Sequence, residues 1–290
     1  MKRALAFLAG VCLAAAQACA EPAIDAVDRI VIPVSELGRA AGFYTGALSF
    51  VPVDAAEPPG VALRLGKETI ELVQQPGRSL PRDSRSNDRW FQHLAIVVSD
   101  IDRAYAIVFR QGAAPISQGI QELPAWNPNA GGIRAVYFRD PDGHPLELIQ
   151  FPPGKGDPRW QQKDRLFLGV DHSAIAVQDT KTSLAFYRGR LGLHVAGTSE
   201  NWGIEQERLS SVPDAQIRIT SLRAPAGLGV EFLQYLSPRD GRPAPSDTSP
   251  EDLWSEVIVM RVDCGDRRSE ILRDPDGPYI VAAIALSRRG

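Results

Sequence analysis

The sequence predicts an α+β fold made of tandem units, each containing a strand, a helix and further strands. Two matches at one spacing indicate the repetition: VDRIVIPV at 27–34 recurs as VDHSAIAV at 170–177, and the Phe43–Tyr44 pair recurs as Phe186–Tyr187, both 143 residues later. A shared offset for two separated matches indicates duplicated units. The copies differ at one informative position, because Arg29 stands where the later copy has His172.

The first 20 residues have the pattern of an export signal. Two basic residues precede an apolar run at 4–16 and small residues at 18–20, which is typical of a cleaved signal peptide. The run is too short to span a bilayer, so we expect removal of 1–20, a periplasmic or secreted protein and no membrane span. A lipoprotein attached through Cys19 is the alternative, although the residues before it fit a lipidation motif poorly.

The remaining composition excludes some classes of partner. Without the signal, 30 basic side chains face 35 acidic ones, and no basic stripe is present, so we expect no nucleic-acid partner. Of the three cysteines, Cys264 alone lies beyond the predicted signal and has no partner for an internal disulfide. The fold must therefore depend on its core or on a metal, and a homodimer is compatible with the sequence.

Residues 21–76 form the first predicted unit, and residues 90–152 the second. The first opens with the strand IVIPV, continues with a helix capped near Ser35 and closes with the strand TIELV. The second has the strand HLAIVV, a helix beginning near Ser99 or Asp100, and the run AVYFRDPDGHPLELIQF. Polar, proline-rich connections at 76–89 and 152–165 separate the units.

Residues 166–238 form the third predicted unit, and 252–286 a shorter fourth. The third has the strand GVDHSAIAV, a helix near Thr180, two hairpin-like strands and the strand LGVEFLQYL. In the fourth, SEVIVMRVD resembles QHLAIVVSD of the second, and RDPDG occurs in both. Fewer residues separate these two motifs in the fourth unit, so we expect its helix and two of its strands to be missing.

The segment YFRDPDGHPLEL at 137–148, together with the repeats, resembles the vicinal oxygen chelate superfamily. This superfamily includes glyoxalase I, extradiol dioxygenases, and bleomycin and fosfomycin resistance proteins. The resemblance implies βαβββ units that pair into cup-shaped mixed sheets around a divalent metal. Here it implies two cups, with the fourth unit truncated. Such a fold supports many chemistries and does not settle function.

The resemblance also implies which strand positions face the metal. These positions are Arg29 and Glu71, His93 and Glu147, His172 and Glu231, and Glu256 and Val281, in the order of the units. A guanidinium cannot bind a metal, so we expect Arg29 and Glu71 to form an ion pair. A lone strand histidine is usually structural, so the prediction depends on four potential ligands, two histidines and two glutamates, at equivalent positions of two units. We predict that His93, Glu147, His172 and Glu231 bind one Fe, Mn, Co, Ni or Zn ion.

Whether these four residues meet depends on how the units pair. Sequential pairing would divide them between two mixed sites. The alternative is that the second unit pairs with the third and the first with the fourth. All four residues would then lie in one cup, and the equivalent positions of the first and fourth units, where other residues replace ligands, would lie in the other. The resemblance to fused members of the glyoxalase class implies the latter arrangement, and we favour it.

The predicted function is that of an exported, metal-dependent enzyme of isomerase, epimerase or lyase type. It would act on a small molecule chelated through vicinal oxygens, with Glu147 or Glu231 as the base. Because glutathione is chiefly cytoplasmic, export disfavours a lactoylglutathione lyase. An Fe(II) extradiol dioxygenase is the alternative, although residues 127–130 lack that family's upstream histidine. A non-catalytic, resistance-like binding protein is a third hypothesis.

Four residues are predicted to contact the substrate at the rim of the cup. They are Trp126 and Asn127 in one loop, and Trp202 and Glu205 in another. An aromatic residue in a proline-glycine loop is more often a packing anchor, which is the competing interpretation. His144, directly after the turn glycine of RDPDG, is expected to be solvated.

Overall fold

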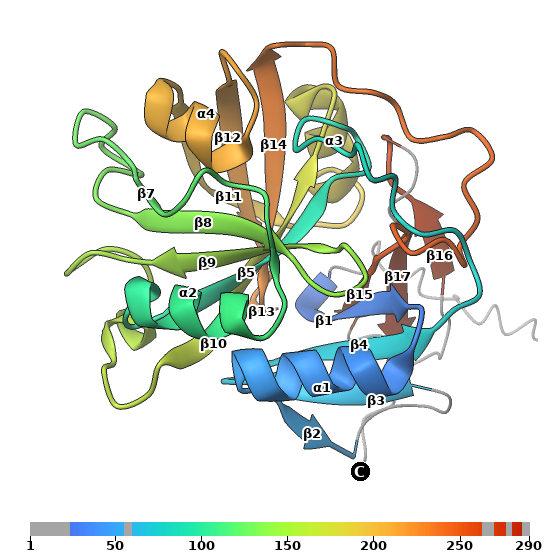
Figure 1. Ribbon diagram of the computed structural model, residues 1–290. Coiled ribbons are helices and arrows are strands. Elements are labelled where there is room, and N and C mark those ends of the chain that lie inside the picture. Colours follow the sequence, from blue (N-terminus) through green and yellow to red (C-terminus); the bar gives the residue numbers. More distant parts are fainter. Residues whose placement is uncertain (1–23, 55–59, 263–269, 277–279, 286–290) are drawn as a thin grey trace, which may run out of the picture.

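The computed structural model describes residues 24–54, 60–262, 270–276 and 280–285. The predicted signal peptide, including Cys19, and Cys264 lie outside these ranges. In the described part of the chain, the helices are all too short or too polar to cross a membrane. The fold is α+β, as predicted, and consists of two large mixed sheets with helices packed on them (Figure 1).

The first unit contains β1 (Ile24–Val34), α1 (Leu37–Leu48), β2 (Val51–Val53), β3 (Gly60–Leu65) and β4 (Glu68–Gln74). The side chain of Glu36, not of Ser35, caps α1, because its carboxylate accepts hydrogen bonds from the backbone N–H groups of Gly38 and Arg39 at 2.8 and 2.6 Å. A carboxylate at this end also complements the helix dipole. The prediction of the helix start was therefore one residue early.

The second unit contains β5 (Gln92–Val98), α2 (Ile101–Arg110), β6 (Ala114–Pro115), β7 (Gln121–Glu122), β8 (Arg134–Arg139) and β9 (Pro145–Gln150). Asp100 caps α2 through a 3.0 Å hydrogen bond from the Arg103 N–H. Between β8 and β9, Gly143 has φ of 96°, a value that suits glycine, and this turn directs β9 back along β8. A 3-10 helix at Pro158–Gln161 lies in the connection to the third unit.

The third unit contains β10 (Phe167–Ala176), α3 (Thr180–Tyr187), β11 (His194–Asn201), α4 (Ile204–Ser210), β12 (Gln216–Arg223), β13 (Ala226–Gly227) and β14 (Gly229–Ser237). Asp179 caps α3, and α4 is a helix beyond those predicted from the sequence. The fourth unit contains β15 (Val257–Val262), β16 (Glu270–Arg273) and β17 (Ile280–Ala285). The described residues of this unit contain three strands, one more than predicted.

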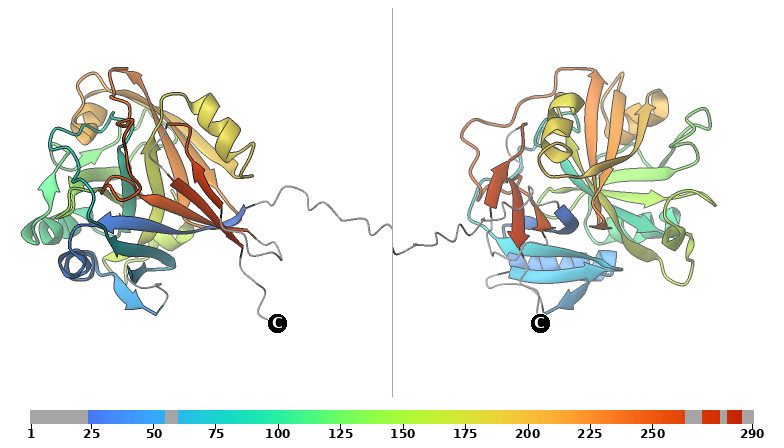
Figure 2. Two further views of the ribbon diagram at one scale, coloured as in Figure 1. Left: turned by 90° about the vertical axis from the view of Figure 1, so that its right-hand side faces the viewer. Right: turned by 180° about the vertical axis from the view of Figure 1, so that it is seen from behind.

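The strand order shows that the middle units share one sheet. That sheet runs β11-β12-β14-β10-β5-β9-β8-β6, with β7 beside β8, and the other runs β16-β17-β15-β1-β4-β3-β2, with β13 beside β1. In both views of Figure 2, the orange strands β12 and β14 lie at the opposite end of the molecule from the blue β2. The favoured pairing, second unit with third and first with fourth, is therefore the one observed.

One hydrophobic core joins the two sheets. It includes Ile30 and Ile32 of β1, Ile96 of β5 and Ile258 of β15, together with residues of α1, α2 and α3. Because strand side chains alternate between faces, the odd-numbered neighbours of these residues point to the other side of each sheet. In the sheet of the middle units, that other side contains the candidate site.

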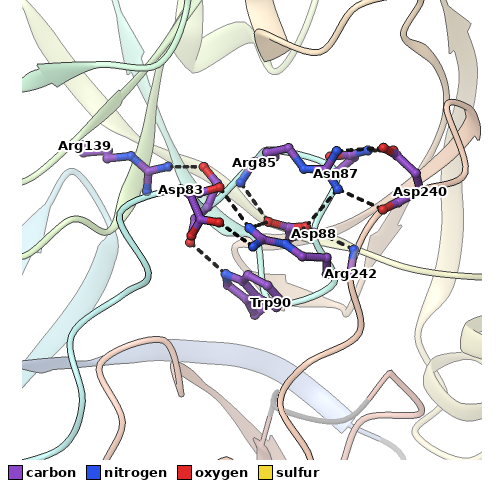
Figure 3. A network of polar contacts seen from close by, with 9 residues as sticks. Asp83, Arg85, Asn87, Asp88, Trp90, Arg139, Asp240 and Arg242 are labelled. Carbon is purple, nitrogen blue, oxygen red and sulfur yellow. Dashed lines mark hydrogen bonds and ion pairs between the residues drawn. The ribbon is translucent and has the colours of Figure 1, made fainter.

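Two connections between units form a clasp, which is the pair of segments 77–90 and 241–254. Their sequences match at an offset of 164, since each has Gly-Arg at its start, Asp at its seventh and twelfth positions and Trp at its end. The contacts are reciprocal. Arg78 donates to Asp252 at 3.0 and 2.7 Å. Arg242 donates to Asp88 at 3.0 and 2.6 Å, and Figure 3 shows this second contact.

Candidate metal centre

Four adjacent strands place the predicted ligands on one face of the second sheet. His93 lies on β5, Glu147 on β9, His172 on β10 and Glu231 on β14. Ala95 pairs with both His172 and Glu147, and Ala174 pairs with both His93 and Glu231. Residues that pair, or that stand two apart on a strand, share a face, so all four side chains point the same way.

The structure brings the four side chains into contact. Nε2 of His93 lies 3.2 Å from Oε2 of Glu147, and Nε2 of His172 lies 3.6 Å from the same oxygen. These three residues are buried and offer ligand atoms within 4.8 Å of one another. Glu231 joins the group through His172, at 3.5 Å between Oε2 and Nε2.

The donor set fits a divalent cation. Neither ring nitrogen of the buried His93 has a hydrogen-bond partner among the described residues, although Nε2 lies close to Glu147. A buried polar atom without a partner is costly and is usually explained by a ligand or a bound ion. Donors placed tetrahedrally at about 2.1 Å from one ion stand roughly 3.4 Å apart, close to the observed separations. Two imidazoles and two carboxylates suit the transition metals named above.

Outer contacts hold His172 and Glu231 in place. Nδ1 of His172 lies 2.9 Å from Oδ2 of Asp171, which leaves Nε2 facing the cluster. Asp171 in turn accepts a hydrogen bond from Arg223 at 2.9 Å, and the Ser221 hydroxyl donates to Glu231. A carboxylate on the far nitrogen of a metal-binding histidine fixes its tautomer and orientation.

The charges of the cluster shift two pKa values. Burial lowers the pKa of His172, but the negative charges of Glu231, Asp171 and Glu147 outweigh this effect and raise the pKa to about 9. Burial raises the pKa of Asp171, but His172 and Arg223 outweigh it and hold this pKa well below its usual range. The protein therefore gathers carboxylates around His172, an arrangement that attracts a cation.

The equivalent positions of the first sheet lack this donor set. Arg29 and Glu71 form the expected ion pair, with Nε of Arg29 2.8 Å from Oε2 of Glu71. The assignment of Glu256 to the cup was wrong. Arg29 pairs with Val259 as His172 pairs with Ala95, so the residue equivalent to His93 is Val257. Glu256 therefore lies one position out of register, on the face that points into the core.

The prediction that His144 is solvated was also wrong, because the side chain is 1% exposed. Its Nδ1 lies 2.9 Å from Oδ2 of Asp140, and its Nε2 lies 2.9 Å from the carbonyl oxygen of Leu253. Tyr44 of α1 donates to the same Asp140 oxygen at 3.2 Å. The RDPDG turn thus connects three units, and His144 has a structural role away from the cup.

A cavity of about 590 Å³ surrounds the cluster. Its apolar wall includes Leu123, Ile133, Ile149, Leu209 and Ile219, and its polar wall includes Asn129, Asn201, Gln206, Ser221 and Arg223. Tyr137 of β8 lies beside His93, with ring centroids 4.7 Å apart. Burial first, and then the negative charges of Glu147 and Glu231, raise the pKa of Tyr137 well above 10, so this side chain keeps its proton.

The four predicted rim residues lie beside this cavity, and the residues that line it do not include them. Trp126 and Trp202 are about half exposed and pack on each other, with ring centroids 4.0 Å apart. Asn127 donates to Asn201 at 2.7 Å and accepts from two backbone N–H groups of its own loop. Glu205 begins α4. These contacts support the packing interpretation, and a role in substrate binding stays a prediction.

Sequence reasoning missed Asp171, Arg223 and Gln206. Asp171 directly precedes a predicted ligand, and it has a counterpart in Asp28 of the first unit, so the repeat contained a signal for it. The sequence contained no such signal for Arg223 or Gln206, because β12 and α4 become neighbours of the cluster only through strand pairing and helix docking.

Comparisons with known proteins agree with this architecture. Residues 26–148 match the sequence profile described as the Glyoxalase/Bleomycin resistance protein/Dioxygenase superfamily. A 2-epi-5-epi-valiolone epimerase of Actinomyces sp. is 32% identical over 157 residues, covering 46% of this chain and 83% of the relative. A virulence protein of Salmonella typhimurium is 27% identical over 128 residues, covering 44% of this chain and 85% of the relative.

Among solved structures, glyoxalase I from Zea mays has a TM-score of 0.59 at 16% identity, over 91% of this chain and 92% of that one. An identity this low shows a shared fold and nothing about the reaction. The epimerase and the family profile establish the wider relationship. The chain belongs to the glyoxalase, bleomycin resistance protein and dioxygenase superfamily.

Proposed function

We propose that this protein is a divalent-metal-dependent enzyme of isomerase, epimerase or lyase type, acting on a small molecule with vicinal oxygens. The observation that supports it is the meeting of His93, Glu147, His172 and Glu231, from two units, in one cavity of about 590 Å³. The Actinomyces relative is an epimerase, which supports proton transfer at carbon as the reaction class.

The ligand roles follow from the contacts. His93, His172 and Glu147 are the three residues with mutually close donor atoms, so they would hold the ion. A bound divalent cation supplies Lewis-acid polarisation of two neighbouring substrate oxygens. Such polarisation makes the hydrogen on the adjacent carbon acidic, and a carboxylate close to that carbon can remove it.

Glu231 is the better placed of the two predicted bases. Its side chain is 17% exposed, against 6% for Glu147, and its contact within the cluster is to one histidine rather than two. The proton would move from the substrate carbon to the Glu231 carboxylate and return to the same carbon or its neighbour. His93 and His172 are the histidines that line the described wall, and both are assigned as ligands, so a carboxylate base agrees better with the site than a histidine acid.

The test combines metal content with hydrogen exchange. Purified protein, reconstituted separately with each candidate metal, is expected to bind one equivalent by elemental analysis. His93→Ala and His172→Ala should each abolish this binding, whereas the matched variant Arg29→Ala, in the other sheet, should retain it. Glu231→Gln should keep the metal but slow deuterium exchange at the hydroxyl-bearing carbon of 2-hydroxycyclohexanone by about 100-fold or more.

Wild-type protein that binds none of the metals would overturn the proposal. Metal binding without ligand-dependent exchange would instead support a non-catalytic binding protein. We also propose that the chain is exported, on the basis of the basic start and apolar run at 1–20. N-terminal sequencing of the protein from its host tests this, because a chain beginning at Met1 would contradict cleavage.

A further inference from the structure

Helix α4 extends the third unit across the cavity to the second. The carbonyl oxygen of Arg208 accepts a hydrogen bond from the Gln118 N–H at 2.9 Å, and that of Leu209 accepts one from the Ser117 hydroxyl at 2.5 Å. These bonds fix the helix against the segment between α2 and β8. The side chains on its inner face, Gln206 and Leu209, line the cavity that contains the metal cluster.

The side chain of Gln206 is buried and has no hydrogen-bond partner among the residues that the structure describes. The side chain is 1% exposed, and neither Nε2 nor Oε1 makes a hydrogen bond to any described group. A buried amide without partners lowers stability, and native proteins rarely retain one without a function. Ser210, one turn later in the same helix, bonds back to the carbonyl oxygen of Gln206, so the backbone here is satisfied and the side chain alone is not.

The chemistry of the amide indicates what would satisfy it. Nε2 donates and Oε1 accepts, so the complementary group must do both. A carboxylate or phosphate only accepts and would leave Oε1 unpaired. A hydroxyl group donates one hydrogen bond and accepts others, and therefore complements both ends of the amide.

The cations of the cavity wall also favour a neutral ligand. Among the described lining residues they are Lys155, Arg159 and Arg223, and each has protein partners. Lys155 donates to the carbonyl oxygens of Gly131 and Pro128, Arg159 pairs with Glu68 at 2.5 Å, and Arg223 pairs with Asp171 at 2.9 Å. Carboxylates already balance the charges of Arg159 and Arg223, so these side chains attract an anionic substrate less than unpaired cations would, whereas a neutral hydroxylated substrate needs no cation.

We propose that Gln206 determines specificity for a neutral, polyhydroxylated substrate by binding one of its hydroxyl groups, at a point separate from the chelated oxygens. This inference rests on the proposed function, because the chelating part of the substrate is assigned to the metal cluster. Gln206 touches no reacting atom in this assignment, so its effect should depend on whether the ligand has hydroxyl groups beyond the chelating pair.

The experiment compares two probes that share the chelating α-hydroxyketone. One is 2-hydroxycyclohexanone, and the other is an inosose, which has a hydroxyl group on every remaining ring carbon. Binding to metal-loaded wild-type protein and to Gln206→Met is measured by calorimetry. The variant is expected to bind the inosose at least about tenfold more weakly, while its affinity for 2-hydroxycyclohexanone changes less than about twofold.

A stability measurement separates recognition from a structural role. Because Met is similar in shape and has no unpaired polar atoms, Gln206→Met should raise the melting temperature of the ligand-free protein by about 2–4 °C. Arg208→Gln, at an exposed position of the same helix, is the control and should leave both affinities unchanged. Gln206→Glu, which keeps the shape but loses the donor, is a second variant and should also weaken inosose binding.

The outcomes distinguish the two proposals. The role of Gln206 would be overturned if Gln206→Met and Gln206→Glu bound the inosose as tightly as the wild type does. It would also be overturned if these variants lost equal affinity for the inosose and for 2-hydroxycyclohexanone. Either result would leave the proposed function intact. A lower melting temperature of Gln206→Met with no selective loss of the inosose would assign the residue to structure. Absence of metal-dependent binding of either probe to the wild type would overturn the proposed function, and this inference with it.

Discussion

At the scale of residues, a single difference between the repeats distinguishes the chemistry of the two sheets. Asp28 and Arg29 in the first unit correspond to Asp171 and His172 in the third. Arg29 makes ion pairs with Asp28 and Glu71, at 2.9 and 2.8 Å, whereas His172 presents Nε2 to Glu147 and Glu231. The aspartate is the same in both copies, but only beside a histidine does it orient a ring nitrogen toward the carboxylates of the candidate site.

This comparison predicts the effect of replacing Asp171. Asp171→Asn should weaken metal affinity about 10–100-fold, because the amide cannot hold the His172 ring through a charged hydrogen bond. Competition with a chromophoric chelator measures the affinity. Asp28→Asn is the matched control in the first sheet and should leave affinity unchanged. Equal affinities of Asp171→Asn and wild type would show that Asp171 serves only to bind Arg223.

At the scale of elements, the sequence predicted the repeated strands well and their exact registers less well. The offset of 143 placed β1, α1, β10 and α3 correctly, and with them Arg29 and His172. In the fourth unit the apolar run at 257–260 allows two alignments one residue apart, and a shift of one residue moves every side chain to the other face. The choice of Glu256 over Val257 followed from that ambiguity.

The sequence of the clasp distinguishes the two possible alignments of the fourth unit. Trp90 and Trp254 end the two matching segments at an offset of 164, and the same offset relates His93 to Val257. Helix α4 is a different case, because a segment of seven residues is too short to form a stable helix alone, and its place is set by hydrogen bonds to the second unit. Local sequence therefore could not predict where α4 docks, nor the place of Gln206 in the cavity.

Burial of Glu256 in the core predicts a dependence of stability on pH. Burial, and the negative charge of Asp140, raise its pKa from 4.5 to about 8, despite the positive charge of His144. Burial lowers the pKa of His144, but Asp140, Glu256 and Asp142 raise it from 6.5 to about 9. Both groups hold protons more tightly in the folded state, so the stability that they contribute at low pH is lost as the pH rises toward 8 and 9.

Glu256→Gln should therefore reduce the loss of stability between pH 5 and 8. Between pH 5 and 8 the melting temperature of the wild type should fall more than that of the variant, by about 2–4 °C for each kcal/mol of linkage. Thermal unfolding across this range measures the difference. Glu251→Gln, at a nearby exposed position, should follow the wild type. Parallel curves for wild type and Glu256→Gln would show that Glu256 is ionised in the folded protein.

At the scale of the whole molecule, the two sheets are joined by the core and by the clasp. In each half of the clasp, one Arg binds an Asp of the opposite half and also lies over the Trp of that opposite half. The guanidinium of Arg78 lies 5.0 Å from the ring centroid of Trp254, and that of Arg242 lies 4.9 Å from the ring centroid of Trp90. The halves also approach closely, since a Cβ on Gly77 would lie 1.9 Å from the carbonyl oxygen of Glu251, and one on Gly241 would lie 1.9 Å from that of Asn87. The first connection leads directly into β5 and His93.

The clasp predicts which acidic residues matter for stability. Asp88 is fully buried, accepts hydrogen bonds from the N–H groups of Arg85 and Arg242, and pairs with the Arg242 guanidinium (Figure 3). Asp88→Ala should lower the free energy of unfolding by about 3–5 kcal/mol, because it leaves these donors without a buried acceptor. Asp252→Ala, in the other half, should cost a similar amount, since its contacts with Arg78 are the same.

The matched controls are the exposed partners of the same two arginines. Asp83 and Asp247 have side chains 75% and 74% exposed, so alanine at either position should cost about 0–1 kcal/mol. Chemical denaturation of the four variants measures the differences. Losses below about 1 kcal/mol for both Asp88→Ala and Asp252→Ala would show that the clasp behaves as a surface contact. The core alone would then determine how the two sheets are joined.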